Sequence, residues 1–99
     1  MKTCSLSNLP EARTLTDGIR VLIAEDQSLV RGALKALLET EPDIAVVAEC
    51  ATGIEVAGLV AKHCVDVALL DIEMPGKNGL DAAAELAGTA CRSLIVTTF

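Results

Sequence analysis

A short apolar run that ends in an aspartate constrains the fold of this chain more than any other feature. Residues 65–70 read VDVALL, and Asp71 follows directly. Such a run is typical of a strand that is buried on both faces, as in a parallel sheet. The residues after it include Pro75, Gly76 and Gly79, which favour a loop. Asp71 is therefore placed at the carboxyl end of a central strand, where open α/β sheets bind their ligands.

A second apolar strand that ends in acids indicates what this aspartate does. Residues 20–24 read RVLIA, and Glu25 and Asp26 follow at once. Taken alone, Asp71 could be a helix cap or a turn residue. If the two strands are neighbours, however, the three carboxylates converge at one edge of the sheet, where unpaired buried charge is costly. A hard cation would offset that cost, and carboxylates without a nearby His or Cys suit Mg²⁺ better than zinc.

Strands alternate with helices along the rest of the chain. Further strands are predicted at residues 44–49 and 92–98. Helices are predicted at residues 28–40, from residue 52 to about residue 63, and at residues 79–87. This alternation predicts βαβ units with right-handed crossovers, and so a doubly wound parallel sheet of the α/β class.

Local signals mark the ends and faces of these helices. Ser28 and Asn78 are predicted N-caps, and the TGIE sequence at residues 52–55 fits a capping box. Gly79 is expected to adopt a backbone conformation that other residues avoid. In the first helix the apolar stripe is expected to face the sheet, and Lys35 is expected to pair with Glu39 on the other face.

Composition limits the size and the partners of the domain. The chain has 99 residues and a net charge of −6. This length suits one small domain, residues 19–99, after a polar leader at residues 1–18 that is expected to be flexible. A surface that binds nucleic-acid phosphates should be basic, so this acidic chain is not expected to bind DNA by itself. No apolar run approaches the roughly 20 residues of a membrane span, and no membrane partner is expected.

At the acidic strand ends the chain resembles the receiver domains of bacterial two-component response regulators. The resemblance lies in EDQSLVRGAL at residues 25–34, DIEMPGKNGL at residues 71–80 and IVTT at residues 95–98. It implies a flavodoxin-like sheet with the strand order 2-1-3-4. It also implies a cytoplasmic signalling module, not an enzyme, in which a sensor histidine kinase phosphorylates Asp71 as part of a phosphorelay.

The resemblance also implies a role for each residue of the site. Mg²⁺ would be held by the carboxylates of Glu25, Asp26 and Asp71 and by the main-chain carbonyl of Glu73. Thr97 would donate a hydrogen bond to the phosphoryl group on Asp71. From its residue type alone, Thr97 could equally be a β-branched strand residue that serves packing.

The chain departs from the family after its fourth strand. It ends at Phe99, whereas receiver domains continue through a fifth strand, and the lysine of the site lies after that strand. A chain that ends there is expected to self-associate through its fourth strand, as a dimer or a swapped oligomer. The missing lysine also keeps an alternative open, a pseudo-receiver that is not phosphorylated and acts as a protein–protein interaction module.

Two segments resemble regulators of the NarL/FixJ type in particular. They are Gln27 with Arg31 after the acidic pair, and EPDIAVVAE at residues 41–49. In that group a C-terminal domain binds DNA and controls transcription. The sequence contains no such segment, so DNA binding is implied only for a parent protein.

Overall fold

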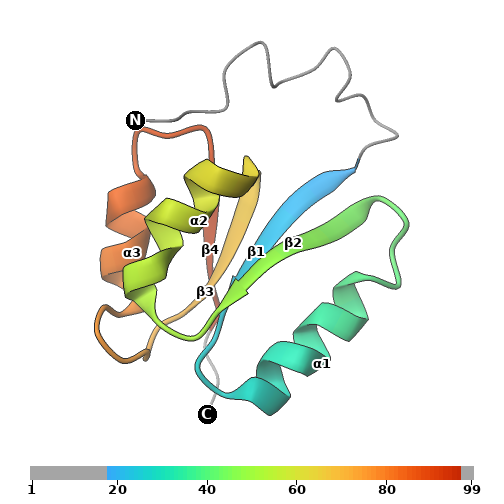
Figure 1. Ribbon diagram of the computed structural model, residues 1–99, viewed down its shortest axis with the longest axis horizontal. Coiled ribbons are helices and arrows are strands. Elements are labelled where there is room, and N and C mark those ends of the chain that lie inside the picture. The colour runs from blue at the N-terminus through green and yellow to red at the C-terminus, as the bar shows by residue number, and fades with distance from the viewer. Residues whose placement is uncertain (1–17, 97–99) are drawn as a thin grey trace.

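The elements follow one another as the alternation of strands and helices predicts (Figure 1). The structure is a computed structural model that describes residues 18–96. The elements are β1 (Ile19–Ala24), α1 (Ser28–Leu38), β2 (Ile44–Cys50), the 3₁₀ turn η2 (Gly53–Glu55), α2 (Val56–His63), β3 (Val67–Asp71), α3 (Gly79–Leu86) and β4 (Arg92–Val96). Of the helices in residues 18–96, none has the length and the apolar character needed to span a membrane.

The four strands form one parallel sheet in the order β2-β1-β3-β4. This confirms the predicted doubly wound α/β fold and the strand order 2-1-3-4. The boundary of β3 differs from the prediction, because the strand begins at Val67 and includes Asp71. The predicted leader lies almost wholly outside the described residues.

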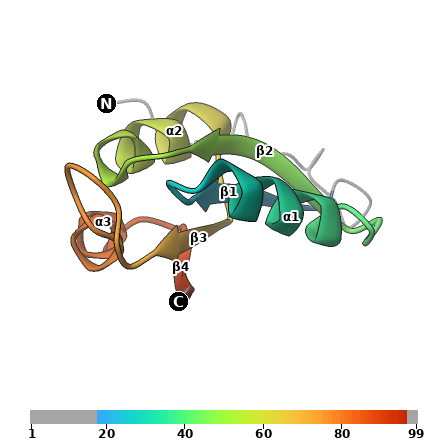
Figure 2. The ribbon, with the colours of Figure 1, turned by 90° about the horizontal axis from the view of Figure 1, so that it is seen from below.

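The two faces of the sheet are covered unequally. Helix α1 lies on one face, and α2 and α3 lie on the other (Figure 2). The largest group of buried apolar side chains lies on the α2 and α3 side, where Leu22 and Leu70 of the sheet pack with Val56, Val60 and Leu86. Because successive strand residues point to opposite faces, Ile23 points to the α1 side instead.

The α1 side is only partly covered. Helix α1 contains no buried residue among its 11 residues, and Leu37 is 67% exposed. Ile23, Leu69 and Leu94 are paired in register across β1, β3 and β4. Their exposure rises along this row, because Ile23 is fully buried, Leu69 is half-buried and Leu94 is 55% exposed. The helix therefore shields the sheet over β1 and leaves β4 open.

The helix caps agree only in part with the sequence signals. The Asn78 side chain accepts a hydrogen bond from the Asp81 amide at 2.8 Å, so this predicted cap is confirmed. Ser28 is the first helical residue instead of the cap, so that prediction is wrong. The capping box is also absent, since the Thr52 hydroxyl donates to the Glu55 carboxylate instead of accepting from a main-chain amide.

Two glycines allow backbones to approach closely around the loop that follows β3. A Cβ atom on Gly53 would lie 1.9 Å from the main-chain oxygen of Lys77, and one on Gly79 would lie 2.1 Å from that of Asp71. Gly79 is not among the described glycines with a positive φ, so the expected reason for it is wrong. The absence of a side chain matters at Gly79, and an unusual backbone angle does not.

Replacing Gly53 by alanine tests this close approach. We expect the free energy of unfolding to fall by about 1–3 kcal/mol, because the new methyl group overlaps the Lys77 carbonyl. Gly58→Ala in α2 is the matched control. A Cβ atom at Gly58 would meet no atom within 4 Å beyond its own stretch of helix, and alanine in a helix is favoured over glycine by about 1 kcal/mol. Urea unfolding followed by circular dichroism measures both variants, and similar effects of the two would contradict the interpretation.

Candidate functional site

Three carboxylates meet at the carboxyl edge of the sheet. Glu25 and Asp26 follow β1, and Asp71 is the last residue of the neighbouring parallel strand β3. One carboxylate oxygen from each of the three lies within 4.8 Å of the others. Glu25 and Asp71 are only 1% and 6% exposed, whereas Asp26 is exposed. The predicted convergence of these three side chains is therefore confirmed.

The Glu25 carboxylate lacks part of the hydrogen bonding that a buried charge requires. Its Oε2 atom accepts a hydrogen bond from the Gln27 amide at 3.1 Å. Its Oε1 atom is buried and has no hydrogen-bond partner among the described residues. A buried acceptor without a partner costs about 1–3 kcal/mol, and more when it is charged.

Burial and the neighbouring Asp71 both oppose ionisation of the Glu25 carboxyl group. Burial is the main cause that raises the pKa of Glu25 above its ordinary value of 4.5, and the charge of Asp71 raises it further. The hydrogen bond from the Gln27 amide acts in the opposite direction. A cation between the carboxylates would reverse the effect of burial. The donor set contains only oxygen, which suits a hard divalent ion such as Mg²⁺.

The loop after β3 is held in place at several points. The Gly79 amide donates to the carbonyl of Ile72 at 2.9 Å, and Met74 is buried in the apolar core. Lys77 pairs with Glu85 of α3. This pair ties the loop to α3.

The structure does not test every predicted site residue. Thr97 lies outside the described residues, so its role stays a prediction, and within them Val96 of β4 is in register with Asp71. Glu73 is exposed in the loop after β3, and the role of its carbonyl stays a prediction.

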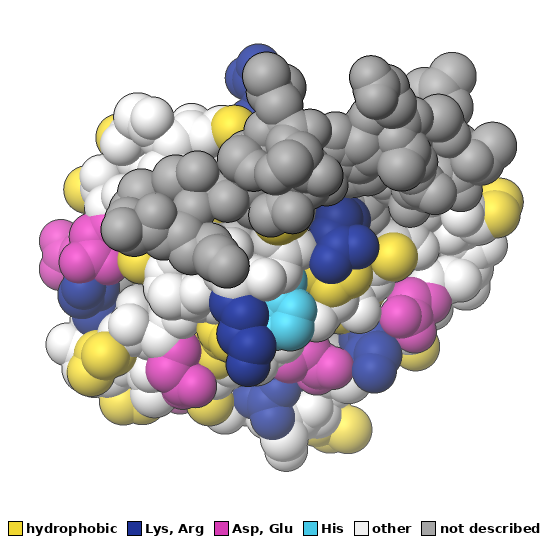
Figure 3. Space-filling view, turned by 45° about the horizontal axis from the view of Figure 1, so that its top comes forward, with side chains coloured by type: hydrophobic (Ala, Val, Ile, Leu, Met, Phe, Trp, Pro, Cys, Tyr) yellow, Lys and Arg dark blue, Asp and Glu magenta, His cyan; other side chains and the backbone are white. Residues whose placement is uncertain are grey.

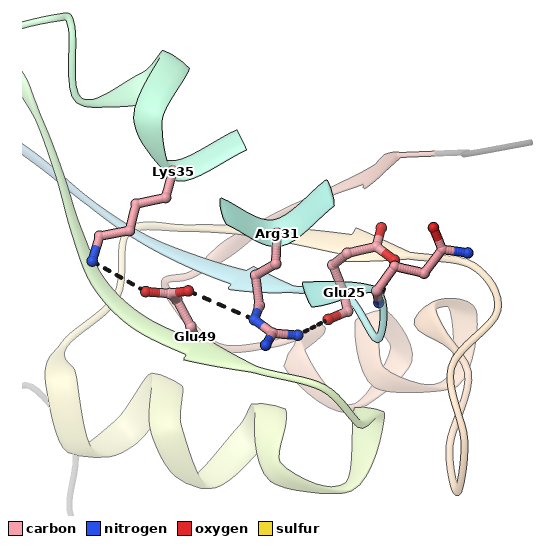
Figure 4. Close-up of polar contacts among 5 residues, drawn as sticks. Glu25, Arg31, Lys35 and Glu49 are labelled. Atoms are coloured by element: carbon pink, nitrogen blue, oxygen red, sulfur yellow. Dashed lines mark hydrogen bonds and ion pairs between the residues drawn. The ribbon is translucent and has the colours of Figure 1, made fainter. Parts of the chain in front are cut away.

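Arg31 is a residue of the site region that the sequence did not reveal. The sequence marked it only as a residue shared with the NarL/FixJ type, yet its guanidinium donates to the main-chain carbonyl of Glu25 at 2.6 Å (Figure 4). Lys35 pairs with Glu49 of β2 at 3.3 Å, so the predicted pair with Glu39 is wrong. A signal was present in the sequence, because Glu49 ends a strand expected beside this helix.

The pH dependence of stability tests the buried charge of Glu25. We expect Glu25→Gln to raise the free energy of unfolding of the metal-free protein by about 1–3 kcal/mol at neutral pH, because it removes that charge. A raised folded-state pKa stabilises the wild type fully below its unfolded value, and this stabilisation is lost as the pH rises through the folded value. The difference between variant and wild type should therefore shrink as the pH falls through the raised folded-state pKa, and it should reach its smallest value below 4.5.

Urea unfolding at a series of pH values, with chelator present, gives this difference. Glu41→Gln is the control, because Glu41 is exposed and such surface changes stay within about 0.5 kcal/mol. A difference between Glu25→Gln and wild type that does not vary with pH would contradict the buried charge.

The sequence of this chain is similar to those of known proteins. The model of the response regulator receiver domain matches residues 21–99. The transcriptional regulatory protein DesR of Bacillus subtilis is 49% identical over 81 residues, which is 82% of this chain and 41% of DesR. A protein-glutamate methylesterase/protein-glutamine glutaminase of Rhodopseudomonas palustris is 35% identical over 86 residues, which is 87% of this chain and 22% of that protein. The chain thus spans less than half the length of these relatives.

Solved structures agree with the sequence matches. The signal receiver domain of the putative response regulator NarL from Mycobacterium tuberculosis has a TM-score of 0.78 at 31% identity, covering 83% of this chain and 68% of that one. A DNA-binding response regulator of the LuxR family from Staphylococcus aureus has a TM-score of 0.76 at 35% identity, covering 82% and 69%. The strand order, the acidic sheet edge and these matches together show that the chain belongs to the response regulator receiver domain family.

Proposed function

We propose that this chain accepts a phosphoryl group on Asp71 from a sensor histidine kinase, in a Mg²⁺-dependent step of a phosphorelay. One observation carries the proposal. A buried oxygen of Glu25 has no hydrogen-bond partner among residues 18–96, and Glu25 belongs to a group of three carboxylates with one oxygen each within 4.8 Å of one another. Membership of the receiver family supports the same function.

Mg²⁺ fits the residues of this edge. Glu25, Asp26 and Asp71 would hold it through their carboxylates, and Glu73 is proposed to add its main-chain carbonyl. When bound, the ion would neutralise charge on the phosphoryl oxygens, on which phosphoryl transfer depends. The donor set fits because Mg²⁺ binds through few carboxylates and keeps several waters.

Asp71 is the proposed nucleophile. One of its carboxylate oxygens would attack phosphorus, while the bond between phosphorus and the kinase histidine nitrogen breaks and its electron pair returns to the imidazole ring. The product is an acyl phosphate on Asp71. The main chain holds Asp71 at the end of β3, between β1 and β4, and we propose that Thr97 donates a hydrogen bond to the transferred group.

The wider role proposed is control of transcription by a cytoplasmic parent protein. DesR, the relative at 49% identity, is a transcriptional regulatory protein. On the face shown in Figure 3, Lys and Arg side chains lie among Asp and Glu side chains instead of forming one basic surface. We therefore assign DNA binding to another domain of the parent, and we assign this domain signalling instead of enzymatic activity.

Acyl phosphate labelling tests the proposed phosphoacceptor. The protein is incubated with Mg²⁺ and a small acyl phosphate, and intact mass spectrometry should show one added phosphoryl group. Asp71→Asn should remove the label, because an amide is not a nucleophile of this kind.

Asp26→Ala should weaken Mg²⁺ binding by about 10-fold or more, since it removes a charged ligand. Asp43→Asn, which changes an exposed acid outside the group, is the control.

Two outcomes would contradict the proposal. Equal labelling of the wild type and Asp71→Asn would show that another residue accepts the group. No labelling together with no Mg²⁺ binding would favour the pseudo-receiver, which acts only through contact with another protein.

We also propose that this chain self-associates through β4. Within the described residues β4 pairs with β3 alone, and Leu94 and Ile95 are 55% and 37% exposed. An exposed apolar edge strand is a template for pairing with another chain. Sedimentation velocity at micromolar concentration should show dimers or larger species, and Leu94→Lys should shift them toward monomer. A compact wild-type monomer would show that the edge does not associate.

A further inference from the structure

Arg31 contacts the main chain that carries two of the three acids. It is the fourth residue of α1, and its side chain is 22% exposed. Its Nη1 atom donates to the main-chain carbonyl of Glu25 at 2.6 Å (Figure 4). A hydrogen bond from a charged donor is stronger than one from a neutral donor.

The guanidinium of Arg31 is oriented by the neighbouring strand. Its Nε atom lies 3.6 Å from Oε1 of Glu49, which is the last residue but one of β2. The next residue, Cys50, accepts a hydrogen bond from the amide of Glu25 at 3.0 Å. The end of β2 therefore holds Glu25 at two points, directly through Cys50 and indirectly through Glu49 and Arg31. A planar guanidinium can reach a carboxylate and a carbonyl at once, whereas an ammonium group is a single point charge.

The Glu25 carbonyl that Arg31 holds sets the direction of residues 25–27, which we call the acidic loop. The Glu25 carbonyl and the Asp26 amide belong to one planar peptide group. Fixing this carbonyl therefore fixes the peptide from which Asp26 begins. The main chain of Arg31 adds a second restraint, because its amide donates to the carbonyl of Gln27 at 2.9 Å. The Gln27 amide in turn donates to the Glu25 carboxylate at 3.1 Å.

We propose that Arg31 is a positioning residue of the acidic site, which holds the Glu25 carbonyl and so directs the carboxylates of Glu25 and Asp26 toward a shared cation. The inference rests on the Mg²⁺ site of the proposed function. Arg31 acts through Glu25 and is not itself a metal ligand. Glu49 is the residue that keeps the guanidinium in place.

Mg²⁺ titration calorimetry on matched variants tests this role. Arg31→Gln should weaken Mg²⁺ binding by about 10-fold, the size of effect seen when residues that orient metal ligands are removed. Arg31→Lys keeps the charge but loses the planar guanidinium, so its Mg²⁺ affinity should stay within about threefold of that of Arg31→Gln. Lys35→Gln is the control, because it also removes one positive charge that pairs with Glu49 from α1. The ion pair of Lys35 is with Glu49, whereas Arg31 also donates to the Glu25 carbonyl. Lys35→Gln should bind Mg²⁺ within about twofold of the wild type.

The labelling rate separates positioning from general damage to the fold. In Arg31→Gln the Mg²⁺ concentration for half-maximal labelling should rise, while the rate at saturating Mg²⁺ stays close to that of the wild type. Full recovery of affinity in Arg31→Lys, or an equal loss in Lys35→Gln, would show that charge alone matters and would overturn the inference.

A measurement without metal keeps the inference separate from the proposed function. In the metal-free protein, hydrogen exchange followed by NMR should show faster exchange of the Gln27 amide in Arg31→Gln than in Lys35→Gln. The amides of β1 should be unchanged, which excludes global destabilisation. Failure of the wild type to bind Mg²⁺ would overturn the proposed function, and the exchange rates would still decide whether Arg31 holds the loop. Equal Gln27 exchange in the wild type and Arg31→Gln would overturn the role of Arg31.

Discussion

The buried carboxylate of Glu25 is the constraint on which the site depends. It lies at the end of β1 beside Asp71, and one of its oxygens has no hydrogen-bond partner among the described residues. An incompletely paired buried charge opposes folding, so it persists only where surrounding contacts hold it. These contacts come from Cys50 of β2, from Gln27 and from Arg31. The fold thus keeps a locally unfavourable group in a fixed position, which is typical of a site that gains its missing partner on binding.

Sheet topology explains why acids from distant parts of the sequence meet. Strand β1 lies between β2 and β3, so its carboxyl end is adjacent to that of β3. The loop after β3 then needs to pass close to both Asp71 and η2. Glycines at positions 53 and 79 make this possible, because each faces a main-chain carbonyl where a side chain would not fit. The α2 and α3 side of the molecule therefore combines the larger apolar core with the placement of the loop that follows Asp71.

The sequence predicted the features that depend on local pattern and missed those that depend on where elements cross. Apolar runs and helix periods were sufficient for the alternation of strands and helices, whereas the strand order came from the resemblance to receiver domains. Acids at two strand ends predicted the convergence of Glu25 and Asp71 once these strands were taken as neighbours. The partner of Lys35 was mispredicted, because an i, i+4 rule considers one helix and the true partner, Glu49, lies on β2. The contact of Arg31 was missed for the same reason. The close approach at Gly79 depends on loop packing, which one sequence does not reveal.

The weaker apolar packing of α1 gives its polar contacts a larger share in holding the site. No residue of α1 is buried, so the hydrophobic contribution to its docking is limited. The ion pairs of Glu49 are partly exposed, and pairs of that kind contribute at most about 1 kcal/mol. Within residues 18–96, the bond from Arg31 to the Glu25 carbonyl is therefore expected to contribute most among the polar contacts that α1 makes with the strand ends. Because the same bond also restrains the acidic loop, the docking of α1 and the geometry of the carboxylates are coupled. A cation that binds only the native arrangement would then stabilise α1 against the sheet as well as the loop itself.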